Sequence, residues 1–162
     1  MKRKLNFSEK RLKQFCRKNN ISLFIFFGSA SKGHISKNSD LDIAISFSDN
    51  KKLNRNIPLF KILAPLEAEL AKIFSISNFE GILEIDLVLI NHASPLLKYN
   101  ISQNGELFYE AEPGLYADFA VRAMKEHNDA RKFYRLAKKN IEDFLRGQEN
   151  DDRKKISPPK AQ

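Results

Sequence analysis

The chain has 162 residues, of which 42% are hydrophobic and 30% charged, and its formal net charge is +8. This balance excludes a disordered chain, and the length allows one domain with a sizeable core. The single cysteine excludes a disulfide framework, and the sequence has neither a membrane-spanning run nor the apolar core of a signal peptide. We therefore expect a cytoplasmic protein, and the positive charge favours an acidic partner: a nucleotide, a nucleic acid or an acidic protein surface.

A helix and a buried strand are predicted first along the chain. Ser8 is a suitable N-cap for a helix over residues 9–18, whose apolar side carries Leu12, Phe15 and Cys16. The apolar run at 21–27 then predicts a buried strand, which Gly28 ends.

A second strand begins at Asp40, after a polar loop. Because alternate residues of a strand share a face, Asp40 and Asp42 are predicted to lie about 7 Å apart on one face. The opposite face is apolar and carries Leu41, Ile43, Ile45 and Phe47. Two carboxylates beside a glycine turn indicate a site for metal and phosphate.

Residues 57–76 have helical spacing that Pro65 interrupts, which predicts a helix starting near Pro65 or a kink there. A third strand is predicted over 83–90, with Asp86 in the middle of an otherwise apolar run. A carboxylate in such a place is unfavourable unless it is paired or binds a metal. A short helix over 95–103 and a short edge strand over 107–109 follow.

Helical periodicity returns at Pro113 and persists to Arg146, with apolar residues recurring at alternating steps of four and three. We predict that this seam docks a partner, with flanking basic residues that attract acidic groups. A continuous helix of this length has to project from so small a domain, or to break near Asn128. The alternative is that the whole seam folds back as core. The predicted organisation is a catalytic domain over 1–112, a helical element over 113–146 and a disordered tail over 147–162.

The glycines at 28 and 33 follow a strand with the spacing that opens a phosphate-binding P-loop. A P-loop continues with lysine and serine or threonine into a long helix, whereas here His34 and Ile35 follow. A Rossmann glycine pattern is also absent. Both of these nucleotide-binding folds are therefore excluded.

The spacing that remains is Gly28-Ser29, ten residues, and then Asp40-Leu41-Asp42. This pattern, with Asp86 on a later strand, resembles the nucleotidyltransferases with a DNA polymerase beta-like fold. The chain is most similar to their minimal members, the MntA-type antitoxins that are paired with HEPN toxins. The resemblance implies an α/β (α+β) fold: a small mixed sheet flanked by helices, followed by the C-terminal helical element.

The resemblance also implies roles for the residues of the motif. Asp40, Asp42 and Asp86 are expected to be catalytic and to bind two magnesium ions, which prefer hard oxygen ligands. Gly28, Ser29 and Lys32 are expected to bind the ATP phosphates together with Asp40 and Asp42. Lys32 stands where many relatives carry arginines, a difference that bears on nucleotide affinity.

The expected reaction is transfer of AMP from ATP to a hydroxyl, by resemblance a tyrosine of a partner HEPN ribonuclease toxin. Two alternatives stay open: transfer to a small hydroxylated molecule such as an aminoglycoside, and a non-catalytic antitoxin that acts by binding alone. We expect no membrane association. Direct binding of nucleic acid is not expected either, since no basic-aromatic motif is present.

Overall fold

The computed structural model describes residues 7–28, 40–49, 57–74 and 85–156, with side chains described as far as Arg146. In these residues four strands form one sheet in the order β3-β2-β1-β4. The strands are β1 (Ile21–Phe26), β2 (Leu41–Phe47), β3 (Ile85–Leu89) and β4 (Glu106–Glu110). β1 is antiparallel to β2 and β4, and β2 is parallel to β3. The predicted mixed sheet is confirmed.

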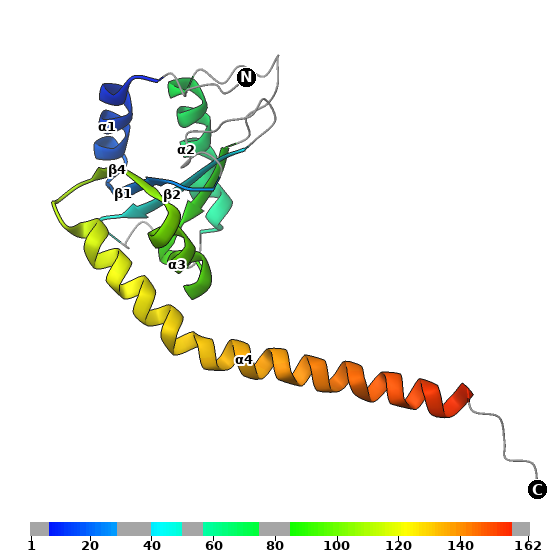
Figure 1. The fold of residues 1–162 in the computed structure, drawn as a ribbon. Coiled ribbons are helices and arrows are strands. Elements are labelled where there is room, and N and C mark those ends of the chain that lie inside the picture. Colours follow the sequence, from blue (N-terminus) through cyan, green and yellow to red (C-terminus); the bar gives the residue numbers. More distant parts are fainter. Residues whose placement is uncertain (1–6, 29–39, 50–56, 75–84, 157–162) are drawn as a thin grey trace, which may run out of the picture.

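Helices cover both faces of this sheet, so the molecule has two cores. One face packs against α1 (Glu9–Lys18) and α2 (Leu59–Ile73), and the other against α3 (Pro95–Asn104) and the beginning of α4 (Leu115–Ile156) (Figure 1). We call these the α1/α2 core and the α3/α4 core. Because both faces are covered, the central strand β1 is apolar at five of its six positions rather than at alternate ones.

β1 lies at the centre of the sheet and supplies both cores. A bulge between Ile21 and Leu23 breaks its alternation. Ile21, Phe24 and Phe26 consequently face the α1/α2 core, while Leu23 and Ile25 face the α3/α4 core. A strand with apolar residues on both faces, interrupted only by Ser22, fits a central position between two covered faces.

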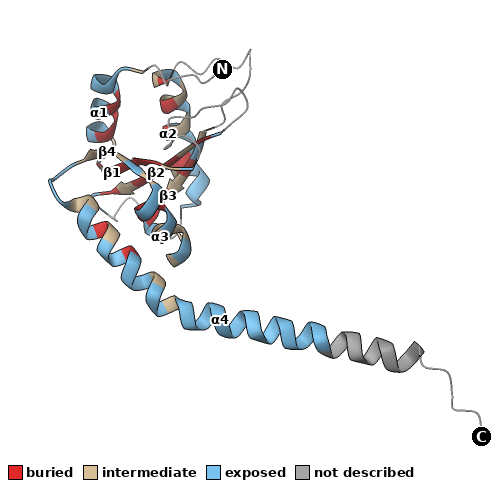
Figure 2. Ribbon diagram, in the orientation of Figure 1, coloured by how far each residue is buried: buried red, intermediate tan, exposed pale blue. Residues whose placement is uncertain are grey.

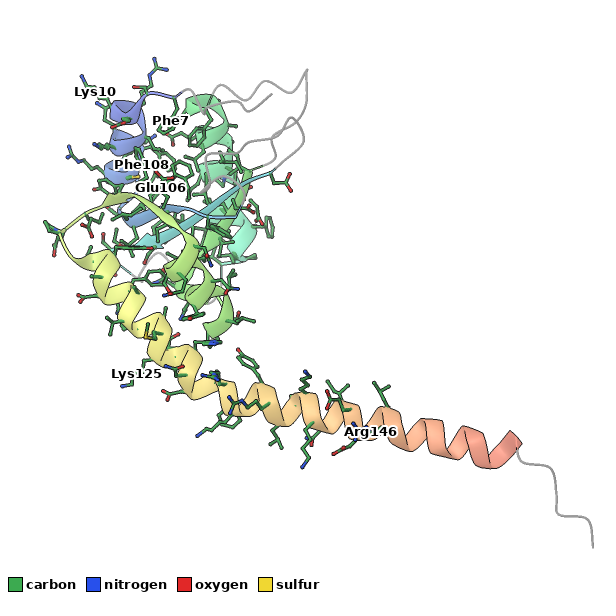
Figure 3. The ribbon with its side chains drawn as sticks, in the orientation of Figure 1. Phe7, Lys10, Glu106, Phe108, Lys125 and Arg146 are labelled. Carbon is green, nitrogen blue, oxygen red and sulfur yellow. The ribbon has the colours of Figure 1, made fainter. Side chains whose placement is uncertain are left out.

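Helix α1 and the α1/α2 core agree with the sequence prediction. The Ser8 side chain accepts a hydrogen bond from Arg11 N at 3.4 Å, and the predicted apolar side of the helix is buried. Phe7 and Phe108 pack at 5.6 Å between ring centroids, and both also contact Phe26 (Figure 3). These aromatic contacts tie the chain preceding α1 to the edge strand β4.

Helix α2 differs from the prediction at its start. It begins at Leu59, after Pro58 as the N-cap residue, and Pro65 lies inside it. Of the two predicted alternatives, a start near Pro65 is therefore wrong, and a kink at Pro65 stays a prediction. Proline in a helix interior removes one backbone hydrogen bond and is unfavourable. The apolar face of α2, formed by Leu63, Leu66 and Leu70, is buried on both sides of Pro65, and this burial favours a continuous helix.

The segment after β3 agrees with the predicted short helix and edge strand. A 3₁₀ turn, η3 (Ile90–His92), leads into α3, and the Ser94 side chain accepts a hydrogen bond from Leu97 N at 3.3 Å. α3 ends at Gly105, where an added Cβ would lie 2.5 Å from Ile101 O. Glycine is therefore required for the direct entry into β4.

Helix α4 is longer than predicted. It runs without interruption from Leu115 to Ile156 and passes through Asn128, so the first ten residues of the predicted disordered tail are helical. Composition is compatible with this extension: five of residues 147–156 are good helix formers, and the proline pair comes only at 158–159. Figure 1 shows the distal part of α4 projecting from the domain, and Figure 2 colours the described residues of this part as exposed.

Candidate functional site

The candidate site begins where β1 ends. Phe27 N donates a hydrogen bond to Asp42 O at 3.1 Å, which continues the β1–β2 pairing by one residue. Gly28 follows with a φ of +63°, a conformation that residues with a Cβ rarely adopt. A Cβ at Gly28 would overlap the Oδ2 atom of Asp42 and lie 2.8 Å from its Cγ. The close approach of backbone and carboxylate therefore requires glycine at this position.

Two of the predicted aspartates lie side by side on adjacent strands. Asp42 and Asp86 are register partners in the parallel β2–β3 pair, in which neighbouring strands are about 4.8 Å apart. Asp42 is half-buried, and Asp86 is exposed as the second residue of β3 rather than lying in its middle. Exposure removes the desolvation penalty that the sequence suggested for Asp86. Both side chains are on the sheet face that Ala44 and Val88 also occupy, by strand alternation.

The third aspartate, Asp40, is exposed and lies just before β2, which begins at Leu41 rather than at Asp40. Strand alternation therefore does not fix its direction. In the described part of the chain, no three histidine, cysteine, aspartate or glutamate side chains are gathered in a way that would hold a metal ion. The structure thus brings Asp42 and Asp86 together and does not gather Asp40 with them.

A fourth carboxylate, Glu67 of α2, was missed from the sequence. Its pKa is raised from the usual value, first by burial and second by the negative charge of Asp86. Glu67 therefore lies within electrostatic reach of the site. The sequence spacing could have indicated this position. Glu67 follows Leu63 by four residues and precedes Leu70 by three, which places it beside the buried face of α2.

The other predicted phosphate-binding residues, Ser29 and Lys32, lie outside the described residues. So does residue 84, at the predicted start of the third strand. Within the described residues, no helix is both long and apolar enough to cross a membrane.

Comparison with known proteins gives the site its context. A family model described as "Polymerase beta, Nucleotidyltransferase" matches residues 10–113. The chain is 33% identical over 129 residues to the protein adenylyltransferase MntA of Aphanizomenon flos-aquae (strain 2012/KM1/D3), covering 77% of this chain and 81% of that protein.

Two solved structures have the same fold. One is a toxin–antitoxin with AMP-PNP, with a TM-score of 0.63 and 19% identity, covering 83% of this chain and 98% of that one. The other is a tri-AMPylated Shewanella oneidensis HEPN toxin in complex with MNT antitoxin, with a TM-score of 0.59 and 19% identity, covering 82% and 94%. The predicted family and fold are thereby confirmed: this chain belongs to the polymerase beta-type nucleotidyltransferases and is similar to their MntA members.

Proposed function

We propose that this chain is a magnesium-dependent nucleotidyltransferase that moves AMP from ATP to a tyrosine hydroxyl of a cognate HEPN toxin. The observation that carries the proposal is the placement of Asp42 between Gly28 and Asp86. The backbone of Gly28 leaves no room for a side chain beside Asp42, and Asp86 is its register partner on the next strand. The result is a carboxylate pair next to a glycine turn.

The donor set fits magnesium, which takes one or two carboxylates together with waters and substrate phosphates rather than a full protein cage. Asp42 and Asp86 would supply such carboxylates, and Asp40 a third in a conformation that the structure does not show. The bound metal would supply positive charge against the phosphates. Gly28, Ser29 and Lys32 would bind the β- and γ-phosphates through backbone N–H, hydroxyl and ammonium groups.

In the proposed reaction the acceptor hydroxyl attacks the α-phosphorus. A new O–P bond forms, the bond to the bridging oxygen breaks, and pyrophosphate leaves with the electron pair. Asp86 is exposed and is therefore accessible to an incoming protein substrate, from whose hydroxyl it would accept the proton.

Similar proteins support a HEPN toxin as the proposed acceptor and ATP as the proposed nucleotide. The similar protein from Aphanizomenon flos-aquae is named a protein adenylyltransferase, one solved relative is a toxin–antitoxin with AMP-PNP, and another has a tri-AMPylated HEPN toxin as its partner. We carry these properties over to this chain as part of the proposal.

The test is transfer of labelled AMP from ATP, in the presence of magnesium, to a purified HEPN-family toxin. Asp42→Asn removes a carboxylate charge without changing its volume, so we expect loss of transfer with an unchanged melting temperature. Asp118→Asn, on the exposed first turn of α4, is the matched control and keeps transfer. Full transfer by Asp42→Asn would refute the proposed use of the carboxylate pair.

Nucleotide binding is tested separately by thermal shift. Millimolar Mg-ATP should raise the melting temperature, because a ligand that binds only the folded state stabilises it. The shift should be smaller in Ser29→Ala and Lys32→Ala. Absence of any shift in the native chain would favour an antitoxin that acts by binding alone.

A further inference from the structure

The first third of helix α4, as far as His127, packs against the domain. Phe119 and Ala123 are buried in the α3/α4 core, and the Tyr116 hydroxyl donates a hydrogen bond to Ser102 O at 3.1 Å. Further along, Lys98 of α3 and Glu126 form an ion pair at 2.9 Å. The His127 ring then stacks on Tyr99 at 4.4 Å. One face of α4 is thus covered as far as His127.

The same face continues beyond His127 without a cover. At 100° per residue, six apolar side chains fall within half of the helix circumference, in line with Phe119 and Ala123. All six are exposed: Phe133 63%, Tyr134 42%, Leu136 57%, Ile141 60%, Phe144 64% and Leu145 52%. We call these six residues the distal face. Figure 2 shows the change from buried to exposed along the helix.

The distal face would supply about three quarters of one side of a specific interface. Aromatic and large aliphatic side chains bury on the order of 200 Å² each, so six that are about half exposed present roughly 600 Å². Specific protein interfaces bury about 800 Å² on each partner. An uncovered patch of this size on a monomer marks an interaction site.

Charge distinguishes a second copy of this chain from another protein. Residues 129–146 contain six basic side chains and three acidic ones, so this segment has a net charge of +3. One of the acids, Glu142, already lies 3.9 Å from Lys138 on the same helix. Figure 3 shows side chains along the distal helix up to Arg146. Pairing two copies would bring the same excess positive charge together, whereas an acidic partner would neutralise it.

We propose that the distal face docks the acceptor protein, through an apolar surface of that protein formed by helices and bordered by acidic side chains. Ala130, Tyr134, Ala137, Ile141 and Phe144 recur at steps of four and three, which is the spacing that packs against another helix. The identity of the docked protein as the acceptor rests on the proposed function. The docking itself rests on the exposed face and its charge.

The experiment measures binding of the full chain to a purified HEPN-family toxin, by isothermal titration calorimetry. The test variant is Phe133→Ala/Ile141→Ala/Phe144→Ala, which preserves helix propensity. Ile57→Ala/Phe60→Ala/Val121→Ala removes three apolar side chains that are exposed elsewhere and is the matched control. We expect the test variant to bind at least a hundredfold more weakly, the control to bind within threefold of the native chain, and both to keep the Mg-ATP thermal shift.

Three results would overturn the docking proposal. The first is native affinity in the test variant, and the second is no binding of the toxin by the native chain. The third is a dimer of the chain alone, seen by sedimentation and lost in the test variant, which would assign the distal face to a second copy. Failure of the proposed function looks different: the native chain and Asp42→Asn would bind with equal affinity, and neither would transfer AMP.

Discussion

Gly28→Ala is the substitution whose consequences follow most directly from the structure. The new methyl group would overlap the Asp42 carboxylate and force that side chain to move. The left-handed backbone at φ +63° adds a penalty of roughly 1–2 kcal/mol for a residue with a Cβ. For a chain of this size each kcal/mol lowers the melting temperature by about 2–4 °C, so we expect a decrease of roughly 2–8 °C.

The effect on transfer should exceed the effect on stability. Displacing a reacting group by about 1 Å can lower a rate by about a hundredfold, so we expect a loss of this order in AMP transfer at a temperature where the variant is folded. Gly114→Ala is the matched control, since Gly114 has a φ of +95° but no heavy atom within 4 Å of an added Cβ. It should be destabilised and fully active.

Transfer is measured for both variants with labelled ATP and the HEPN-family protein, at 10 °C below the lower melting temperature. Native activity in Gly28→Ala would show that the contact between Gly28 and Asp42 is irrelevant to the chemistry. Equal losses in Gly28→Ala and Gly114→Ala would attribute both effects to the backbone.

Two further predictions concern the cores. Phe24 is fully buried and packs on Phe26 and Phe108, so Phe24→Ala should lower the free energy of unfolding, measured by urea denaturation, by about 3–5 kcal/mol. Phe60→Ala removes an exposed side chain and should change the free energy of unfolding by less than about 0.5 kcal/mol. Equal effects of the two substitutions would contradict the described packing. Burial raises the pKa of the Cys16 thiol from 9.0 to about 12, so the folded chain should resist a thiol reagent at pH 8 and react after unfolding. The thiol ionises at a lower pH in the unfolded chain than in the folded chain. The difference in free energy of unfolding between the native chain and Cys16→Ala should therefore contain a stabilising contribution of the thiol that is present below pH 9 and is lost as the pH rises towards 12. A difference that does not change with pH would contradict the burial of Cys16.

Local patterns predicted the elements that depend on local chemistry. The Ser8 and Ser94 caps, the apolar runs of β1 and β2 and the buried side of α1 all appear as expected, because capping and burial act within a few residues. The spacing of Gly28, Asp40 and Asp42 indicated the family. Predicting these features does not require knowing which distant residues pack against them.

Other features depend on partners distant in the sequence. Pro65 lies inside α2 because three leucines are buried around it, and Glu67 approaches Asp86 only after α2 packs beside β3. The register of Asp42 with Asp86 comes from a parallel strand pair whose crossover is long. The length of α4 beyond residue 146 was missed because the polar composition was interpreted as disorder, although five of residues 147–156 are good helix formers.

The strand order has a consequence for biosynthesis. β1 and β2, at the centre of the sheet, are translated first, while both edges, β3 and β4, come from the second half of the chain. Leu23, Ile25 and Ala44 remain uncovered until Phe119 and Ala123 have left the ribosome, because α3 and α4 supply their cover. A nascent chain of some hundred residues therefore presents an apolar sheet surface and an unpaired strand edge to the cell. Such a chain is a natural client for chaperones, and one that ended before residue 119 would be expected to aggregate or be degraded.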